Sequence, residues 1–145
     1  MTSTNGRAPE GAFQLAPQLQ RDTHAVTRLA LCSVRLLNDA RFPWLVLIPR
    51  LPDAREVHRL TAEQQRQLID ESSHAAAALE ALYRPDKINL GALGNLVPQL
   101  HWHVVARFVD DPCWPGPVWG CGQAMPYGPA ELEIRIGELR GALEP

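Results

Sequence analysis

Apolar residues alternate with more polar ones in the first third of the chain, which is the pattern of a half-buried β-strand. Within residues 31–37, Cys32, Val34 and Leu36 occupy every second position. The short apolar run 45–48 follows, and it is typical of a strand that is covered on both faces. Turn-forming residues separate the two segments, so we expect them to pair as an antiparallel hairpin.

Residues 61–83 carry the one long helical pattern. Thr61 can cap the first turn, and Gln64, three residues later, can reach back to it in a capping box. The apolar positions fall on one side, as in a helix that lies on a sheet. They are Leu68, Ile69, Ala75, Ala76, Leu79, Leu82 and Tyr83.

Two further strands and a short helix follow. A strand is expected to start at Ile88, and residues 99–107 are predicted to form one long strand. A short amphipathic helix over 130–143 closes the chain. A hairpin, a helix and then two more strands predict an α+β fold with an antiparallel sheet.

The bulk properties narrow the class of protein. A chain of 145 residues suits one domain, which we expect over residues 11–145 after a flexible leader over 1–10. A net charge of −2 argues against a nucleic-acid binder, and no apolar run is long enough to cross a membrane. Three widely spaced cysteines without a Cys-x-x-Cys pair suggest reduced thiols in a cytoplasm, rather than disulfides or a structural zinc site.

The candidate chemistry lies on one face of the strand predicted over 99–107. Side chains alternate along a strand, so Gln99, His101, His103 and Arg107 should share the face opposite the core, with the two histidines about 7 Å apart. Histidine can act as a nucleophile or exchange a proton near neutral pH. An amide can orient an imidazole, and a guanidinium grips phosphate through two bonds. The set therefore suits attack on phosphorus, with the glycine-rich stretch 91–95 offering backbone N–H groups to anionic oxygens.

The segment 98–105, Pro-Gln-Leu-His-Trp-His-Val-Val, resembles the signature of the histidine triad (HIT) superfamily, in which three histidines alternate with apolar residues. The resemblance covers roughly residues 13–120 by motif order. It implies a HIT-like sheet of about five antiparallel strands with one main helix and a short C-terminal helix. By the same resemblance, His101 attacks the α-phosphorus of a nucleotide to form a covalent nucleotidyl-histidine. His103 then contacts the transferred phosphate and the leaving group.

Other matches to the family extend the predicted site. Asn38 resembles an asparagine that contacts the ribose, and Asn89, Gly94 and Asn95 stand where the family holds phosphates. Arg107 matches a basic residue four places after the last histidine. The resemblance also implies a nucleotide substrate, a homodimer and no required metal, although a divalent ion could accompany a polyphosphate substrate.

Two positions depart from the family pattern. Gln99 stands at the first histidine of the triad, and Trp44 stands where many members have the histidine of a Pro-Gly-His turn. In the family that histidine connects to the first triad histidine, so both ends of one relay are changed together. The change suggests a retuned site with weaker or altered activity.

Three hypotheses follow. The first is a hydrolase acting on a nucleoside phosphoramidate or a dinucleoside polyphosphate. The second is a nucleotide-binding module with little or no turnover. The third is a metal-binding protein that uses the His-x-His pair with a third ligand, for which the candidates are His24, His58, Asp39 and Asp110.

Overall fold

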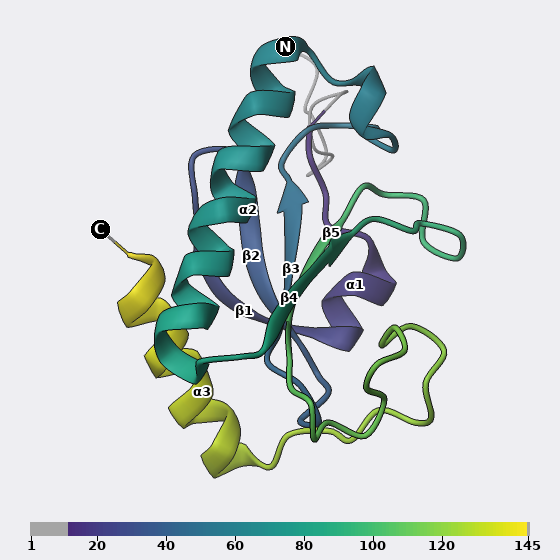
Figure 1. Ribbon diagram of the computed structural model, residues 1–145. Coiled ribbons are helices and arrows are strands. Elements are labelled where there is room, and N and C mark those ends of the chain that lie inside the picture. Colours follow the sequence, from purple (N-terminus) through teal and green to yellow (C-terminus); the bar gives the residue numbers. More distant parts are fainter. Residues whose placement is uncertain (1–11, 145) are drawn as a thin grey trace, which may run out of the picture.

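The computed structural model describes residues 12–144, so the leader expected over 1–10 lies outside the described residues. A five-stranded sheet has the order β1-β2-β3-β5-β4, and every neighbouring pair is antiparallel (Figure 1). The strands are β1 (Thr23–Arg28), β2 (Cys32–Leu37), β3 (Trp44–Pro49), β4 (Lys87–Gly91) and β5 (Trp102–Arg107). The helices are α1 (Pro17–Asp22), α2 (Ala62–Tyr83) and α3 (Pro129–Leu143), with a 3-10 turn at Val57–Arg59. The predicted α+β fold is confirmed.

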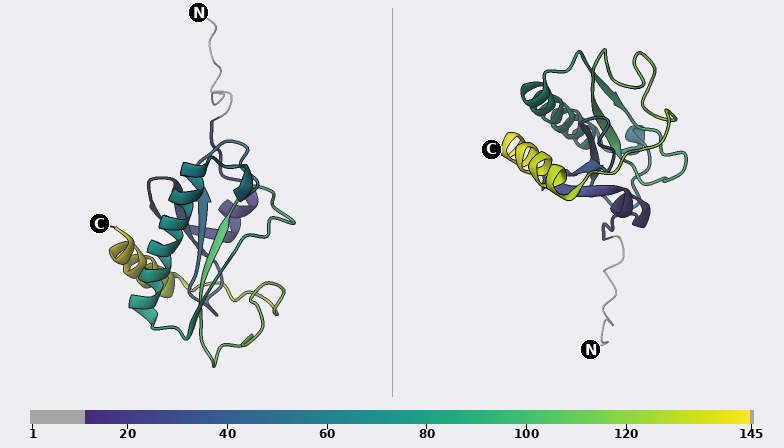
Figure 2. Two further views of the ribbon diagram at one scale, coloured as in Figure 1. Left: turned by 45° about the horizontal axis from the view of Figure 1, so that its top comes forward. Right: turned by 90° about the horizontal axis from the view of Figure 1, so that it is seen from below.

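The sheet is covered differently on its two faces. Helices α2 and α3 lie side by side against one face, whereas α1 and the loops around β5 lie on the other (Figure 2). Strand β3 is buried along its whole length, as its apolar run predicted. Its Leu45 and Leu47 point to the helices, and Trp44, Val46 and Ile48 point to the opposite core. None of the described helices is long and apolar enough to span a membrane.

The hairpin and the long helix form where their patterns predicted them. β2 pairs with β3 from Cys32↔Pro49 onward, and the Thr61–Gln64 capping box is present at the start of α2. The sequence pattern does not predict β1. Its buried residues, Thr23 and Val26, are three positions apart, whereas a regular half-buried strand buries every second residue. A register shift between Ala25 and Thr27 breaks that alternation.

The strand predicted over 99–107 is shorter than expected and starts at Trp102. Pairing accounts for the difference, because β3 reaches β5 only as far as Leu47↔Trp102, and β4 only as far as Gly91↔His103. The backbone N–H of Leu100 instead donates to the carbonyl of Ala54, at 2.9 Å. Residues 99–101 therefore form an irregular approach to the strand.

A buried carboxylate joins α2 to the edge of β2. Glu71, 4% exposed, accepts hydrogen bonds from the backbone N–H groups of Leu31 and Cys32, each at 2.8 Å, and from the Gln67 amide at 2.6 Å. These bonds satisfy two backbone donors where the chain turns from β1 into β2.

Replacing Glu71 with alanine should lower the free energy of unfolding by about 2–4 kcal/mol, because two buried or half-buried N–H groups lose their acceptor. Urea denaturation measures the loss. The matched control is Asp70→Ala, which removes an exposed carboxylate from the same turn. Equal effects of the two substitutions would contradict this role for Glu71.

Candidate active site

A cavity of about 550 Å³ opens on the sheet face opposite α2 and α3. β3 and β5 supply its floor through Trp44, Val46 and His103, and the loop 93–97 and the segment 118–122 form walls. A second cavity, of about 450 Å³, adjoins the first, and both are lined by Leu93, Gly94 and His101. His101 thus lies where the two cavities meet.

The hydrogen bond made by His101 fixes which of its ring nitrogens is free. Its Nδ1 lies 2.7 Å from the backbone carbonyl oxygen of Gln99. A carbonyl oxygen can only accept, so Nδ1 carries the proton in this bond. The neutral ring then keeps the lone pair of Nε2, which is the atom that a nucleophilic imidazole uses.

His103 has the opposite arrangement. The indole N–H of Trp44 donates to Nδ1 of His103 at 2.8 Å, so the proton of the neutral ring is on Nε2. The side chain is 7% exposed. Burial, together with the neighbouring His101, lowers the pKa of His103 to about 4. His103 is therefore a neutral hydrogen-bond donor at pH 7.

Three aromatic rings enclose the imidazole of His103. The ring centroids of His101, Trp119 and Trp44 lie 5.1, 5.4 and 5.6 Å from it, all in edge-to-face geometry. This packing holds the two imidazoles in contact at the cavity wall.

Gln99 does not line the first cavity, contrary to the shared face expected from the sequence. Its amide oxygen accepts from the N–H of Ala16 at 2.8 Å, and its amide nitrogen donates to the carbonyl of Gln14 at 2.8 Å. Because residues 99–101 are not in a strand, the alternation that put Gln99 beside His101 does not apply. What Gln99 brings to the site is its backbone carbonyl.

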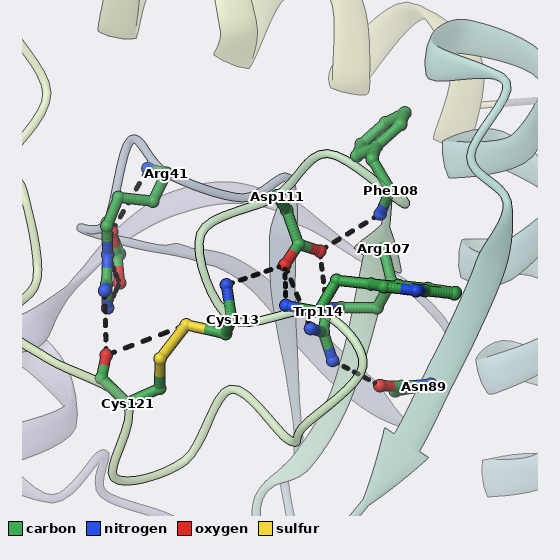
Figure 3. Close-up of a disulfide and its surroundings, with 9 residues drawn as sticks. Arg41, Asn89, Arg107, Phe108, Asp111, Cys113, Trp114 and Cys121 are labelled. Carbon is green, nitrogen blue, oxygen red and sulfur yellow. Dashed lines mark hydrogen bonds and ion pairs between the residues drawn. A yellow bond between two sulfur atoms is a disulfide. The ribbon is translucent and has the colours of Figure 1, made fainter.

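The guanidinium of Arg107 is buried and bonded to neighbouring side chains. Arg107 is 1% exposed, and its guanidinium pairs with Asp111 at 2.8 Å and donates to Asn89 at 2.8 Å (Figure 3). Burial disfavours the charged form of Asp111, but Arg107 and backbone N–H groups outweigh burial and hold its pKa at about 2. The geometry therefore favours a structural role for Arg107 and Asn89, rather than the predicted phosphate contacts.

The remaining predicted residues divide between the cavity and its surroundings. Gly94 and Asn95 line the cavity, and Gly94 has a positive φ of 73° that favours glycine. The amide oxygen of Asn38 instead accepts from the N–H of Tyr127. Its neighbour Asp39 does line the cavity. The sequence indicates Asp39 only as a candidate third ligand of a metal ion.

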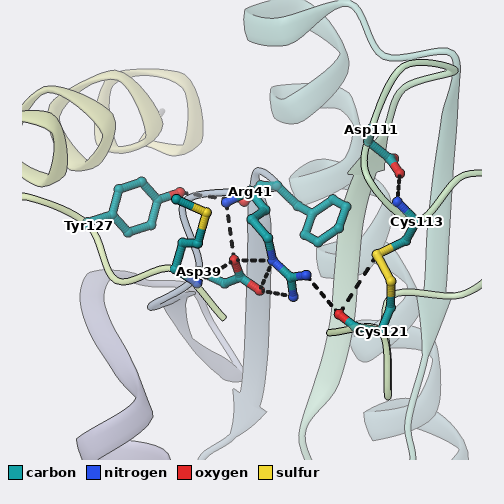
Figure 4. A network of polar contacts seen from close by, with 8 residues as sticks. Asp39, Arg41, Asp111, Cys113, Cys121 and Tyr127 are labelled. Atoms are coloured by element: carbon teal, nitrogen blue, oxygen red, sulfur yellow. Dashed lines mark hydrogen bonds and ion pairs between the residues drawn. A yellow bond between two sulfur atoms is a disulfide. The ribbon is translucent and has the colours of Figure 1, made fainter. Parts of the chain in front are cut away.

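Arg41 connects Asp39 to the loop that walls the cavity. Its guanidinium forms an ion pair with Asp39 at 2.9 Å and donates to the carbonyl of Cys121 at 2.7 Å (Figure 4). Both side chains line the cavity. The sequence pattern did not indicate Arg41, because its partner carbonyl lies 80 residues away.

The expectation of three reduced thiols is wrong for two of the cysteines. Cys113 and Cys121 form a disulfide, and Cys32 remains free and buried. The disulfide closes a loop that carries Val118 and Trp119 to the cavity. The proline- and glycine-rich sequence between the cysteines folds back on itself, so that residues eight positions apart meet.

A metal site would need a third ligand beside the two histidines. Among residues 12–144, no group of three or more histidine, cysteine, aspartate or glutamate side chains gathers in a way that could hold a metal ion. Of the proposed third ligands, Asp39 is held by Arg41 and His58 lines the second cavity.

The antiparallel sheet, and the cavity with His101 and His103 at its wall, agree with the resemblance of segment 98–105 to the histidine triad class. The chain belongs to the HIT domain family, whose family model matches residues 18–110. Three solved histidine triad proteins are similar to it. The protein from Marinobacter aquaeolei VT8 is 43% identical, with a TM-score of 0.90, over 92% of this chain and 98% of its own.

The other two proteins match similar shares of this chain. The protein from Sinorhizobium meliloti 1021 is 45% identical, with a TM-score of 0.88, over 90% of this chain and 97% of its own. The protein from Bradyrhizobium japonicum is 43% identical, with a TM-score of 0.88, over 91% of this chain and 98% of its own. A comparison with curated proteins gave no significant match.

The low pKa of His103 should make stability depend on pH. An unfolded histidine takes up a proton below pH 6.5, whereas folded His103 resists protonation until about pH 4, so acid favours the unfolded chain. As the pH falls from 6.5 to 4, this group should remove about 3 kcal/mol from the free energy of unfolding. Urea denaturation across that range measures the change.

The control is His103→Asn, whose amide oxygen can still accept from Trp44 but does not titrate. Its stability should fall less steeply over the same range. Parallel curves for the two proteins would show that His103 titrates normally.

Proposed function

We propose that the protein is a nucleotidyl hydrolase that acts at the α-phosphorus of a nucleoside phosphoramidate or a dinucleoside polyphosphate. The observation that carries the proposal is the pair of opposed tautomers, in which His101 offers a lone pair and His103 offers an N–H beside one cavity. Family membership supports it, because histidine triad proteins are generally nucleotide-binding hydrolases or transferases.

In the proposed reaction, Nε2 of His101 attacks the α-phosphorus and forms an N–P bond as the bond to the leaving group breaks. Nδ1–H stays bonded to the Gln99 carbonyl, which stabilises the positive charge that the ring acquires. Nε2–H of His103 and backbone N–H groups near Asn95 bind the phosphate oxygens. Water then attacks phosphorus, releases a nucleoside monophosphate and restores His101.

The larger cavity suits the nucleoside. Its volume of about 550 Å³ falls in the range of small-molecule sites, and aromatic and aliphatic side chains from both core and loops line it. Trp44, Val46 and Trp119 offer apolar surface to a base. The covalent step needs no metal ion, and a divalent ion could accompany a polyphosphate substrate. Homodimer formation stays a prediction from the resemblance. A cytoplasmic location also stays a prediction, but the Cys113–Cys121 disulfide removes the argument from three reduced thiols.

A second candidate function is nucleotide binding with little turnover. The hydrogen bonds of the Gln99 amide favour this second function. The amide bonds to the backbone of Gln14 and Ala16, so the first triad position supplies no side-chain group to the cavity. In that case a nucleoside monophosphate would stabilise the fold, and no substrate would be cleaved.

Substitution of His101 by alanine should lower kcat/KM at least about 1,000-fold, because the nucleophile is lost. The assay uses diadenosine triphosphate and an adenosine phosphoramidate. Acid-quenched wild-type protein should carry an adenylyl group on the peptide that contains His101, as detected by mass spectrometry. The control His24→Ala, on β1, should keep both activity and the adduct.

Full activity of His101→Ala would refute the catalytic assignment. Absence of turnover and adduct in the wild type, combined with stabilisation by AMP, would establish the binding module instead.

A further inference from the structure

We infer that the leaving group accepted by this site is an anionic phosphate chain rather than an amine. The inference rests on the proposed function and narrows its substrate class. Two independent observations carry it. The indole N–H of Trp44 donates a hydrogen bond to Nδ1 of His103, so that nitrogen carries no proton. The second cavity, which His101 also lines, is lined by Arg55.

The first observation concerns the proton that an amine needs when it leaves phosphorus. His103 holds one proton on Nε2 and could give it to the amine only if Nδ1 gained a proton at the same time, because imidazolate is too basic to form at neutral pH. Trp44 blocks that exchange. Its indole N–H is a donor only and does not release its proton at neutral pH.

The other groups packed around His103 do not replace this proton. Trp119 presents a second indole, and Nδ1–H of His101 is bonded to the Gln99 carbonyl. The charged residues that line the same cavity are Asp22, Asp39 and Arg41, of which Asp39 and Arg41 are paired with each other. His103 therefore donates a hydrogen bond without acting as a general acid, and an amine would depend on solvent for its proton.

A phosphate leaving group removes this requirement. As Nε2 of His101 bonds to the α-phosphorus, the bond between phosphorus and the bridging oxygen breaks, and its electron pair stays on the departing phosphate. That oxygen is stable as an anion near pH 7, so the step balances without proton transfer. The hydrogen bond from His103 is sufficient to stabilise the developing charge.

The second observation is the position of the smaller cavity. A substrate with its α-phosphorus at His101 has two arms, and two cavities meet at that residue. Beyond the shared residues, the smaller cavity is lined by apolar side chains and by four charged or polar ones, namely Arg55, Glu56, His58 and Gln65. Arg55 is exposed and makes no hydrogen bond or ion pair within residues 12–144, so its guanidinium is available to a phosphate arm. Glu56 lines the same cavity, so recognition depends on the placement of the guanidinium rather than on net charge.

The test compares two substrates that transfer the same adenylyl group. Diadenosine triphosphate releases ADP, and adenosine 5′-tryptamine phosphoramidate releases a neutral amine. For the wild type we expect kcat/KM to be at least about tenfold higher for diadenosine triphosphate, and Arg55→Ala should lower that value about tenfold while leaving the phosphoramidate unchanged. The matched control Arg59→Ala removes a neighbouring exposed charge that does not line the second cavity, and it should change neither value.

Trp44→His tests the blocked proton directly, because a histidine can exchange a proton with Nδ1 of His103. It should raise the ratio of phosphoramidate to diadenosine triphosphate hydrolysis, a ratio that a general loss of packing would not change. If this variant does not fold, the wild-type preference and the Arg55 variant still decide the matter.

Equal or faster hydrolysis of the phosphoramidate by the wild type would overturn the inference, and so would equal losses on both substrates in Arg55→Ala. In either case the adduct on His101 would still be found, and the proposed function would stand. Failure of the proposed function has a different signature: His101→Ala keeps its activity, or neither substrate is cleaved and no adduct forms.

Discussion

Two hydrogen bonds of fixed direction determine what this site can do. A carbonyl oxygen can only accept and an indole N–H can only donate, so Gln99 and Trp44 impose opposite tautomers on His101 and His103. The two rings touch edge to face, with centroids 5.1 Å apart. Without these bonds, each imidazole could take either tautomer, and neither the lone pair of His101 nor the N–H of His103 would be assured.

Both hydrogen bonds depend on where the pairing between β3 and β5 begins and ends. Trp44 pairs with Val105 and Val46 pairs with His103, so Trp44 and His103 emerge on the same face of adjacent strands. Pairing stops at Trp102, and the irregular backbone of 99–101 then brings the Gln99 carbonyl to His101. Strand β5 thus positions His103, the donor, and the irregular segment 99–101 that precedes it positions His101, the proposed nucleophile.

Local patterns in the sequence predicted much of this arrangement. The period of two over 31–37, the capping box at Thr61 and the resemblance of 98–105 to the histidine triad signature identified the hairpin, the main helix and the family. The pattern also placed His103 on the sheet face opposite the helices, because alternation holds within the strand.

What the sequence did not predict depends on contacts between distant segments. Strand alternation places Gln99 beside His101 only if the strand extends beyond Trp102, the last residue that pairs with β3. The resemblance implies a phosphate contact for Arg107, whereas its guanidinium pairs with Asp111, four residues later. The disulfide and the cavity wall at Trp119 depend on how a proline-rich loop folds back, which no local period encodes.

The most direct test of the account is a nitrogen-15 NMR spectrum of the imidazoles at pH 7, with signals assigned by substitution of each histidine. His101 should show a protonated Nδ1 and a bare Nε2, and His103 should show the reverse. If both rings had the same tautomer, or if His103 were charged at that pH, the opposed pair would not exist and the mechanism built on it would be wrong.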